Sequence, residues 1–263
     1  MSQALRNPAF DFTMRAMKHT LIIILFVFAL FISAASYAAK DMGEGYAAPT
    51  FEELSQTAVL MGGLDINDPK VADEYIRLLY CDLYQKNFKD DVAWNKVQSS
   101  TISRILEKKE YFRVQYEVEN DYKFDRYNFE GQYFPFTSDT AMVNVGSIVL
   151  LDPTTYHLYC DLKTSSEYFP PAINLVLTQP LTVNKFRLPM EQVQPLLARM
   201  DEMKNTTRQV FGRIRFRVTD VPGLVIFNDT PIRSELRGEV TAVDFFLDRE
   251  MTRYLGSVDL RGK

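Results

Sequence analysis

The spacing of the apolar residues changes once along this chain, near residue 111, and this change limits the folds open to it. Before it, apolar side chains recur every three to four residues, as on the buried face of a helix, in the stripe Ala72, Ile76, Leu79 and Leu83. After it, apolar and polar residues alternate, as on a half-buried strand, with the apolar set Phe112, Val114, Tyr116 and Val118. Helices followed by strands predict an α+β fold with a largely antiparallel sheet.

Capping residues predict where the helices begin. Thr50 and Glu53 form a capping box, and Asp68 precedes a proline that suits the first helical turn. Asp90 begins a third helix, and the helical unit covers residues 51–110. The segment before Pro69 resembles the start of a calcium loop, but proline stands at a ligand position, so helix capping by Asp68 is the better interpretation. We expect the apolar stripe and Trp94 to be structural core.

The second half of the chain has further strand patterns, separated by prolines and glycines. Strands are predicted over residues 112–118, 142–151, 156–162, 173–178, 213–218, 224–227 and 235–247. Val221-Pro222-Gly223 predicts a turn, one more helix is expected near 189–204, and 248–255 are expected to form a terminal helical turn. Residues 51–263 are therefore predicted to be a single α+β globular domain, with mainly strands over 111–263.

The N-terminus has the three parts of a secretory signal peptide. Basic residues precede an unbroken apolar run over residues 21–32, and small residues follow it. Ser36 and Ala38 stand at the −3 and −1 positions, which predicts cleavage after Ala38 and a periplasmic or secreted protein. Residues 1–38 are then the signal peptide and 39–50 a flexible tether.

Two alternatives to this leader stay open. The apolar run is shorter than the roughly 20 residues that cross a bilayer as a helix. Membrane attachment is therefore expected only through an uncleaved N-terminal segment that extends to Ala39. Met1, Met14 and Met17 are alternative translation starts.

Cys81 and Cys160 are the two cysteines of the chain. In an oxidising compartment such a pair favours one disulfide. Its loop of about 80 residues would stabilise the fold by roughly 4 kcal/mol in the chain-entropy model. Two separately buried thiols are the alternative, because the distance between the side chains cannot be derived from the sequence.

Composition and motifs argue against several classes of function. A net charge of −4 argues against a nucleic-acid partner, because such proteins usually present a strongly basic surface. Neither glycine-rich phosphate loop, GxxxxGKS/T or GxGxxG, is present. After export His157 is the one histidine left, and its odd spacing from Cys160 on a strand argues against a catalytic pair. We predict no catalytic residue, no metal site and no cofactor.

Aromatic and acidic residues each allow two interpretations. The aromatic band from Tyr111 to Phe136 is either a platform for stacking on sugars or a buried sheet core, and the core is favoured. A glycosidase needs two carboxylates about 5–9 Å apart. The candidate pairs are Asp90/Asp91, Glu117/Glu119 and Asp244/Asp248. Among 34 acidic residues such pairs arise by chance, so exposed, solvated carboxylates are favoured.

Arg213, Arg215 and Arg217 place three guanidinium groups on one face of a strand, an arrangement called here the arginine ladder. As an anion-binding patch it would hold an anionic lipid head group, a polymer or a protein partner. The favoured alternative is that acids such as Glu235 and Glu239 lie across from it on the next strand.

Three segments of the chain are distinctive: DPKVADEYIRLLYCDLYQKNFKDDVAWNKV, which begins at Asp68, and the later RQVFGRIRFRVTDV and VTAVDFFLDREMTRYLG. With these segments the chain resembles a bacterial family of exported proteins known only as a domain of unknown function. The resemblance covers most of residues 51–260. It implies a setting in the bacterial cell envelope and transfers no catalytic or binding residue.

We therefore expect an exported domain that acts as a binding or structural accessory protein of the cell envelope, with an envelope protein or polymer as partner. The rival function is a carboxylate-dependent hydrolase that acts on envelope polysaccharide. A concave pocket lined by two facing carboxylates would favour the hydrolase.

Overall fold

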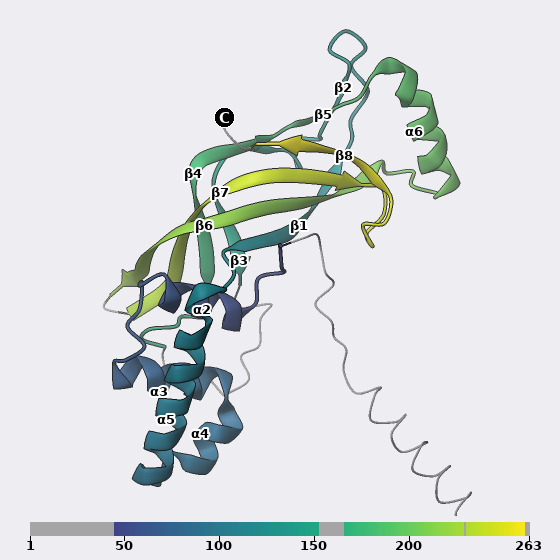
Figure 1. Ribbon diagram of the computed structural model, residues 1–263. Coiled ribbons are helices and arrows are strands. Elements are labelled where there is room, and N and C mark those ends of the chain that lie inside the picture. Colours follow the sequence, from purple (N-terminus) through teal and green to yellow (C-terminus); the bar gives the residue numbers. More distant parts are fainter. Residues whose placement is uncertain (1–44, 153–165, 229, 261–263) are drawn as a thin grey trace, which may run out of the picture. The chain divides into compact units, whose positions relative to one another are not determined.

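The computed structural model describes residues 45–152, 166–228 and 230–260 (Figure 1). All of them belong to the chain unit Met42–Lys263. Helices come first and a mostly antiparallel sheet follows, with one further helix between the strands over residues 190–202. The predicted α+β class is therefore confirmed.

The helical unit consists of α2 (Phe51–Leu60), α3 (Pro69–Leu79), α4 (Cys81–Asn87), α5 (Asp91–Leu106) and the short 3-10 helix η1 (Glu107–Glu110). Its caps are those that the sequence predicts. The side chain of Thr50 accepts from the N–H of Glu53, that of Asp68 from Lys70, and that of Asp90 from the second residue of α5. Asp68 is thus a helix cap, as expected.

The predicted stripe of α3 is confirmed only up to Leu79. Tyr80 has φ −129° and ψ 59°, outside the helical region, so α3 ends there and α4 starts in a new direction. Ala72, Ile76 and Leu79 are buried, whereas Leu83 is 41% exposed. The prediction that Leu83 continues the stripe is wrong, because the helical period does not carry through the break.

Trp94 of α5 is half-buried and packs against the core from its edge. Its indole N–H donates to Asp73 of α3 at 2.9 Å, and Gln98 donates to the same carboxylate oxygen. The role of Trp94 is therefore structural, as expected, and it attaches α5 to α3.

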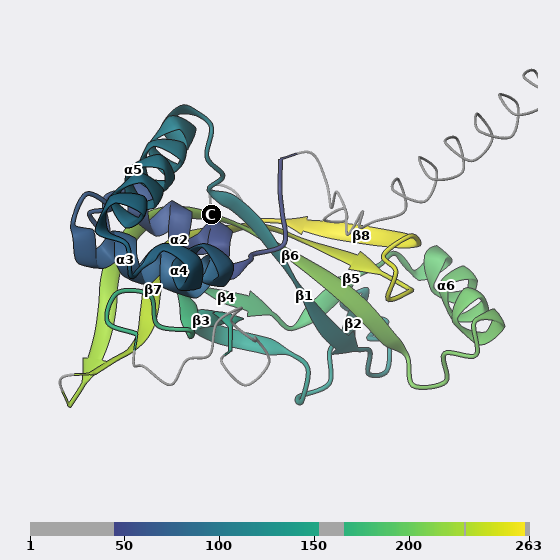
Figure 2. The ribbon, with the colours of Figure 1, turned by 90° about the horizontal axis from the view of Figure 1, so that it is seen from below.

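Six strands form the main sheet: β1 (Gln115–Lys123), β3 (Met142–Leu151), β4 (Ile173–Val183), β6 (Gln209–Phe227), β7 (Thr230–Phe246) and β8 (Tyr254–Asp259). Their order is β1-β6-β7-β4-β3, and β8 also pairs with β7. The β4–β7 pair is parallel, and the other pairs are antiparallel. Helices α2–α5 gather at one end of this sheet (Figures 1 and 2).

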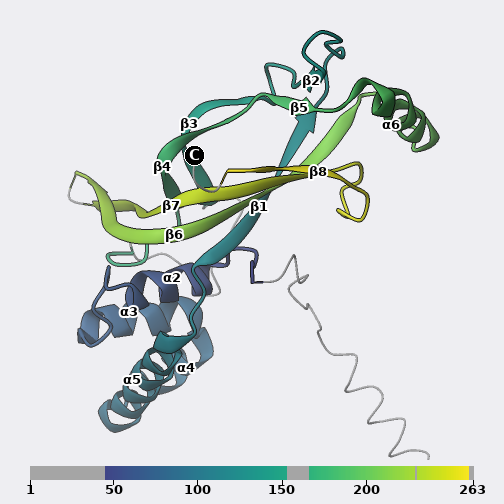
Figure 3. The same cartoon turned by 45° about the horizontal axis from the view of Figure 1, so that its top comes forward.

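The short strands β2 (Tyr133–Pro135) and β5 (Lys185–Arg187) pair with each other, and helix α6 (Met190–Glu202) follows β5. They lie at the end of the sheet away from the other helices (Figure 3). The predicted helix near 189–204 is confirmed.

Two predicted turns differ from the structure. Strand β6 continues through Val221-Pro222-Gly223, where irregular pairing with β7 and a φ of +114° at Gly223 accommodate the proline. The chain reverses only after Phe227. Residues 248–255 form no helical turn, since β8 begins at Tyr254 and pairs with β7. The strand predicted over 156–162 lies outside the described residues.

The aromatic band is core, as favoured. Tyr116, Tyr122, Phe124, Phe134 and Phe136 are buried. Tyr122 and Phe136 contact Phe245 of β7, with ring centroids 5.4 Å apart in each case. Tyr111 and Phe129 are exposed, so these two positions were wrongly included in the core.

Candidate functional site

The arginine ladder lies on β6 with its guanidinium groups on the face opposite the core. Ile214, Phe216 and Val218, which alternate with the arginines, are buried. This arrangement is the one that strand alternation predicts.

Acids lie across from all three arginines, but they are not all the predicted ones. Glu117 of β1 sits between Arg213 and Arg215, with Nε–O distances of 3.4 and 3.3 Å. Asp244 of β7 contacts Arg215 at 3.1 Å. The predicted partner Glu239 contacts Arg217 at 2.6 Å, and the salt bridge of Glu235 is with Arg233.

Glu117 and Asp244 were expected to be solvated carboxylates, and this expectation is wrong. They are 1% and 5% exposed. Burial raises the pKa of Glu117, although Arg213 and Arg215 act to lower it. The register of the β1–β6 pair accounts for the position of Glu117, because it places Glu117 opposite Arg215, whose side chain contacts it.

The four charges of Glu117, Arg213, Arg215 and Asp244 form a balanced cluster, called here the buried charge cluster. Aromatic rings cover it, since the guanidinium carbon of Arg213 lies 4.9 Å from the Phe246 ring centroid and that of Arg215 lies 5.4 Å from that of Tyr46. The cluster joins β1, β6 and β7. Arg217 is the most exposed member of the ladder, with 51% of its side chain exposed against 26% for Arg215 and 11% for Arg213.

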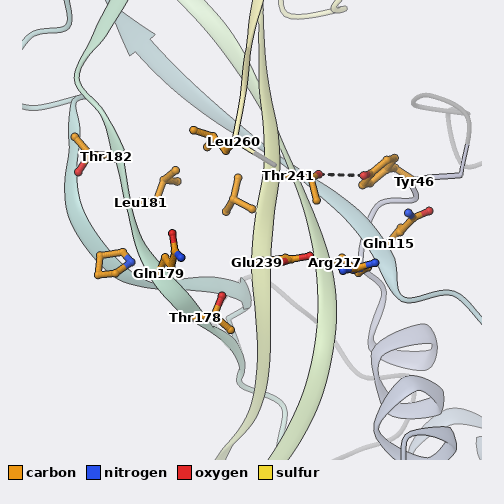
Figure 4. A pocket seen from close by; sticks show the side chains of 12 residues that line it. Tyr46, Gln115, Thr178, Gln179, Leu181, Thr182, Arg217, Glu239, Thr241 and Leu260 are labelled. Carbon is orange, nitrogen blue, oxygen red and sulfur yellow. Dashed lines mark hydrogen bonds and ion pairs between the residues drawn. The ribbon is translucent and has the colours of Figure 1, made fainter. Parts of the chain in front are cut away.

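A cavity of about 700 Å³ opens beside this cluster, where the sheet divides (Figure 4). Strand β4 pairs with β7 up to Gly238, and β8 pairs with β7 from Ala242 onward. Between these points β4 leaves β7, and the space between them is called here the fork cavity. Its lining consists of residues 178–182, Arg217, residues 239–241, Tyr46, Gln115 and Leu260.

Tyr46 belongs to the short segment before α2, and two contacts hold its side chain in the lining. Ala47 pairs with β1, where its carbonyl accepts from the N–H of Glu117 at 2.9 Å. The hydroxyl groups of Tyr46 and Thr241 are 3.0 Å apart and hydrogen-bonded. Tyr46 and Ala47 lie within residues 39–50, the segment predicted to be a tether. They pack against the sheet, and Tyr46 forms one side of the fork cavity.

The polar side chains on the β4 side of the cavity have spare hydrogen-bonding capacity. Thr182 accepts from the N–H of Asn144. Thr178 and Gln179 are exposed, and their side chains make no hydrogen bond to another described residue. Figure 4 shows them across the cavity from Glu239 and Thr241. These groups are free to bind a ligand.

Acid–base chemistry has little support in the fork cavity. Among the described lining residues Glu239 is the one carboxylate, and Arg217 holds it. Of the other predicted pairs, Asp90 and Asp91 are exposed at the start of α5. Asp248 accepts backbone hydrogen bonds from Thr252 and Arg253 in the β7–β8 turn.

A second polar cluster lies between α2, α3 and η1. Gln56 donates to the hydroxyl of Tyr75 and accepts from Lys108, and Tyr80 donates to Glu52. Burial, together with the Glu52 carboxylate, raises the pKa of Tyr80 to about 12. Its phenol is therefore neutral near pH 7, and this cluster is structural.

Sequence patterns also missed Glu74, a buried residue of α3. It accepts from the N–H groups of Glu167, Tyr168 and Phe169 at 2.8–2.9 Å, and from the hydroxyl of Ser166. It thus attaches residues 166–169 to α3. Charge-assisted bonds of this kind are among the stronger hydrogen bonds in proteins.

Several predicted site residues fall elsewhere. Cys81 is the first residue of α4, while Cys160 and His157 lie outside the described residues. The disulfide therefore stays a prediction. In the part of the chain that the structure describes, no group of three or more His, Cys, Asp or Glu residues could hold a metal ion. No helix of that part has the length and hydropathy needed to cross a membrane.

Comparison with known families supports the resemblance seen in the sequence. Residues 68–197 match the family model described as Domain of unknown function (DUF4852), which confirms the resemblance to a domain of unknown function over this range. The matched range begins at the cap of α3 and includes the β4 side of the fork cavity, but not β6 or β7. Comparison with curated proteins and with solved structures gives no match.

Proposed function

We propose that this protein is an exported binding protein of the bacterial cell envelope, which holds its ligand in the fork cavity. The observation that supports this most directly is the cavity itself. Its volume of about 700 Å³ falls within the roughly 300–1,000 Å³ that is typical of small-molecule sites. Its walls combine apolar side chains with the side chains of Thr178 and Gln179, which make no hydrogen bond to another residue that the structure describes.

Binding is preferred over hydrolysis because of the acids. A polysaccharide hydrolase of the carboxylate type needs two carboxylates that face the scissile bond from about 5–9 Å apart. Glu239 lines the cavity alone among the described carboxylates, and its Oε1 is held in a salt bridge with Arg217 at 2.6 Å. This arrangement supports a site that binds without catalysing a reaction.

The leader supports the proposed location. Residues 1–38 have the order of a basic segment, an apolar run and small residues that is typical of export signals. An exported protein with an open polar cavity would meet envelope polymers and proteins before any cytoplasmic metabolite.

Backbone amide chemical shifts of the ¹⁵N-labelled protein, purified after export, would test the proposal. The probes are neutral tetrasaccharides (chitotetraose, cellotetraose and maltotetraose), anionic tetragalacturonate and the peptide tetraalanine. We expect at least one probe to shift the amides of Thr178, Gln179, Leu181, Thr182 and residues 239–241, and to leave those of α5 unchanged. If no probe of any of the three classes shifts the cavity amides, the proposed function is wrong.

A further inference from the structure

We infer that the fork cavity binds a neutral oligosaccharide. This inference rests on the proposed function and names the class of its ligand. It follows from the charge, the hydrogen-bonding groups and the apolar surface of the cavity lining, taken in turn below.

The charge of the described lining residues sums to zero. Arg217 and Glu239 are the charged residues among them, and their side chains meet at 2.6 Å. The other two arginines of the ladder are engaged with Glu117 and Asp244. A cavity whose charges cancel has no net field to select an anionic or a cationic ligand, which favours a neutral one.

The free polar groups of the lining match sugar hydroxyls. Each hydroxyl of a sugar both donates and accepts, and so do a threonine hydroxyl and a glutamine amide. Thr178 and Gln179 offer such groups, and within the described part of the chain neither side chain has a hydrogen-bond partner. The Arg217–Glu239 pair adds donors and acceptors side by side, with 51% and 44% of the two side chains exposed. Adjacent hydroxyls of a sugar ring fit such a pair.

Apolar side chains complete the match. Pro180, Leu181, Val240 and Leu260 lie among the polar groups of the lining. A sugar ring has C–H faces between its hydroxyl edges, so it can cover apolar surface and hydrogen-bond at the same time. A small, fully polar solute would leave these side chains uncovered.

A peptide fits less well, although the divided sheet has an open edge. Only residues 239–241 of β7 lie between the segments paired with β4 and β8. The carbonyl of Thr241 already accepts from the N–H of Leu260 at 2.9 Å. The remaining edge of β7 is shorter than the usual strand of about five to six residues. On the facing edge of β4, Pro180 has no N–H to donate, so an added peptide strand would gain few backbone bonds on either side.

The test compares two matched glutamines in titrations of the same exported protein with the neutral tetrasaccharides. Gln179→Ala removes a cavity amide, and Gln194→Ala removes an exposed amide from α6. We expect Gln179→Ala to raise the Kd of the bound tetrasaccharide about tenfold, as expected for the loss of one or two hydrogen bonds. Gln194→Ala should leave the Kd unchanged. Equal effects of the two variants would overturn the inference.

A second variant tests the argument from charge. Glu239→Gln leaves Arg217 without its acid. Tetragalacturonate should therefore bind the variant more tightly than it binds the natural chain, and this gain in affinity should shrink as the salt concentration rises. Binding of tetragalacturonate or tetraalanine at residues 178–182 by the natural chain, without any neutral tetrasaccharide, would overturn the inference and leave the proposed function standing. Failure of every probe would count against the proposed function itself.

Discussion

Glu117 is the residue whose chemistry differs most from its place in the sequence pattern. It occupies a position on β1 that alternation assigns to solvent, and it is buried between Arg213 and Arg215. A buried charge is tolerated when it is paired, and the removal of one partner leaves the others uncompensated. The buried charge cluster therefore depends on Glu117.

The first prediction is that Glu117→Gln lowers the free energy of unfolding by about 3–5 kcal/mol, the range for breaking a buried ion pair. Urea unfolding followed by circular dichroism measures it. Glu119→Gln is the matched control, because Glu119 is exposed on the same strand, and its effect should stay within about 0.5 kcal/mol. A loss below about 1 kcal/mol in Glu117→Gln would show that the cluster does not stabilise the sheet.

At the scale of single elements, the break between α3 and α4 separates two leucines that share one sequence pattern. Leu79 is buried at the end of α3, and Leu83 is 41% exposed on α4. The same substitution at the two positions should therefore have different consequences.

We predict that Leu79→Ala lowers the free energy of unfolding by about 2–5 kcal/mol, through lost burial and the cavity that remains. Leu83→Ala should cost less than about 1 kcal/mol, because its side chain is already partly in water. Both are measured by denaturant unfolding. Similar costs for the two variants would mean that α3 and α4 form one continuous helix.

The turn between β7 and β8 depends on Asp248. Its carboxylate accepts from the N–H groups of Thr252 and Arg253 and from the Thr252 hydroxyl. Burial acts to raise the pKa of Asp248, but these hydrogen bonds outweigh it and lower the pKa below its ordinary value. A carboxyl whose pKa is lower in the folded state stabilises the fold above its unfolded pKa, near 3.9.

Asp248→Asn should therefore be less stable than the natural chain at pH 7. Below about pH 4 the difference should shrink, because the natural carboxylate also takes up a proton as the pH falls through its folded-state pKa. Thermal unfolding of both proteins at pH 7 and pH 3 measures this. A difference that grows toward acid pH would contradict the role given to Asp248.

At the scale of the whole molecule, we predict a disulfide between Cys81 and Cys160. The bridge would stabilise the fold by roughly 4 kcal/mol, because it closes a long loop in the unfolded chain. Reductant should change the electrophoretic mobility of the exported protein after it has been denatured. In a separate measurement on the folded protein, reductant should lower the Tm. Labelling of both thiols in unreduced, denatured protein would exclude the bridge.

We also predict export of the protein with cleavage after Ala38. Mass spectrometry of the exported protein should find Ala39, within about two residues, at its N-terminus, as the spacing of Ser36 and Ala38 indicates. Recovery of an intact residue 21–32 segment in the membrane fraction would instead indicate an uncleaved anchor.

The local sequence by itself determined the helix starts and the class of the fold. A cap needs only a side chain and the N–H groups two or three residues later, so Thr50, Asp68 and Asp90 were predicted correctly. The period of the apolar residues likewise depends on neighbours within one or two turns or a few strand positions. It therefore predicted β3 and helix α6.

Tertiary structure alone decided which polar residues are buried and which form the fork cavity. Glu117 meets Arg215 through strand register, which joins residues 98 positions apart. The cavity needs Tyr46, Gln179, Arg217 and Glu239 from four separate segments, and it exists because β4 leaves β7 where the β8 pairing begins. Such long-range pairings are selected by the packing of the whole sheet, and no local period of side chains encodes them.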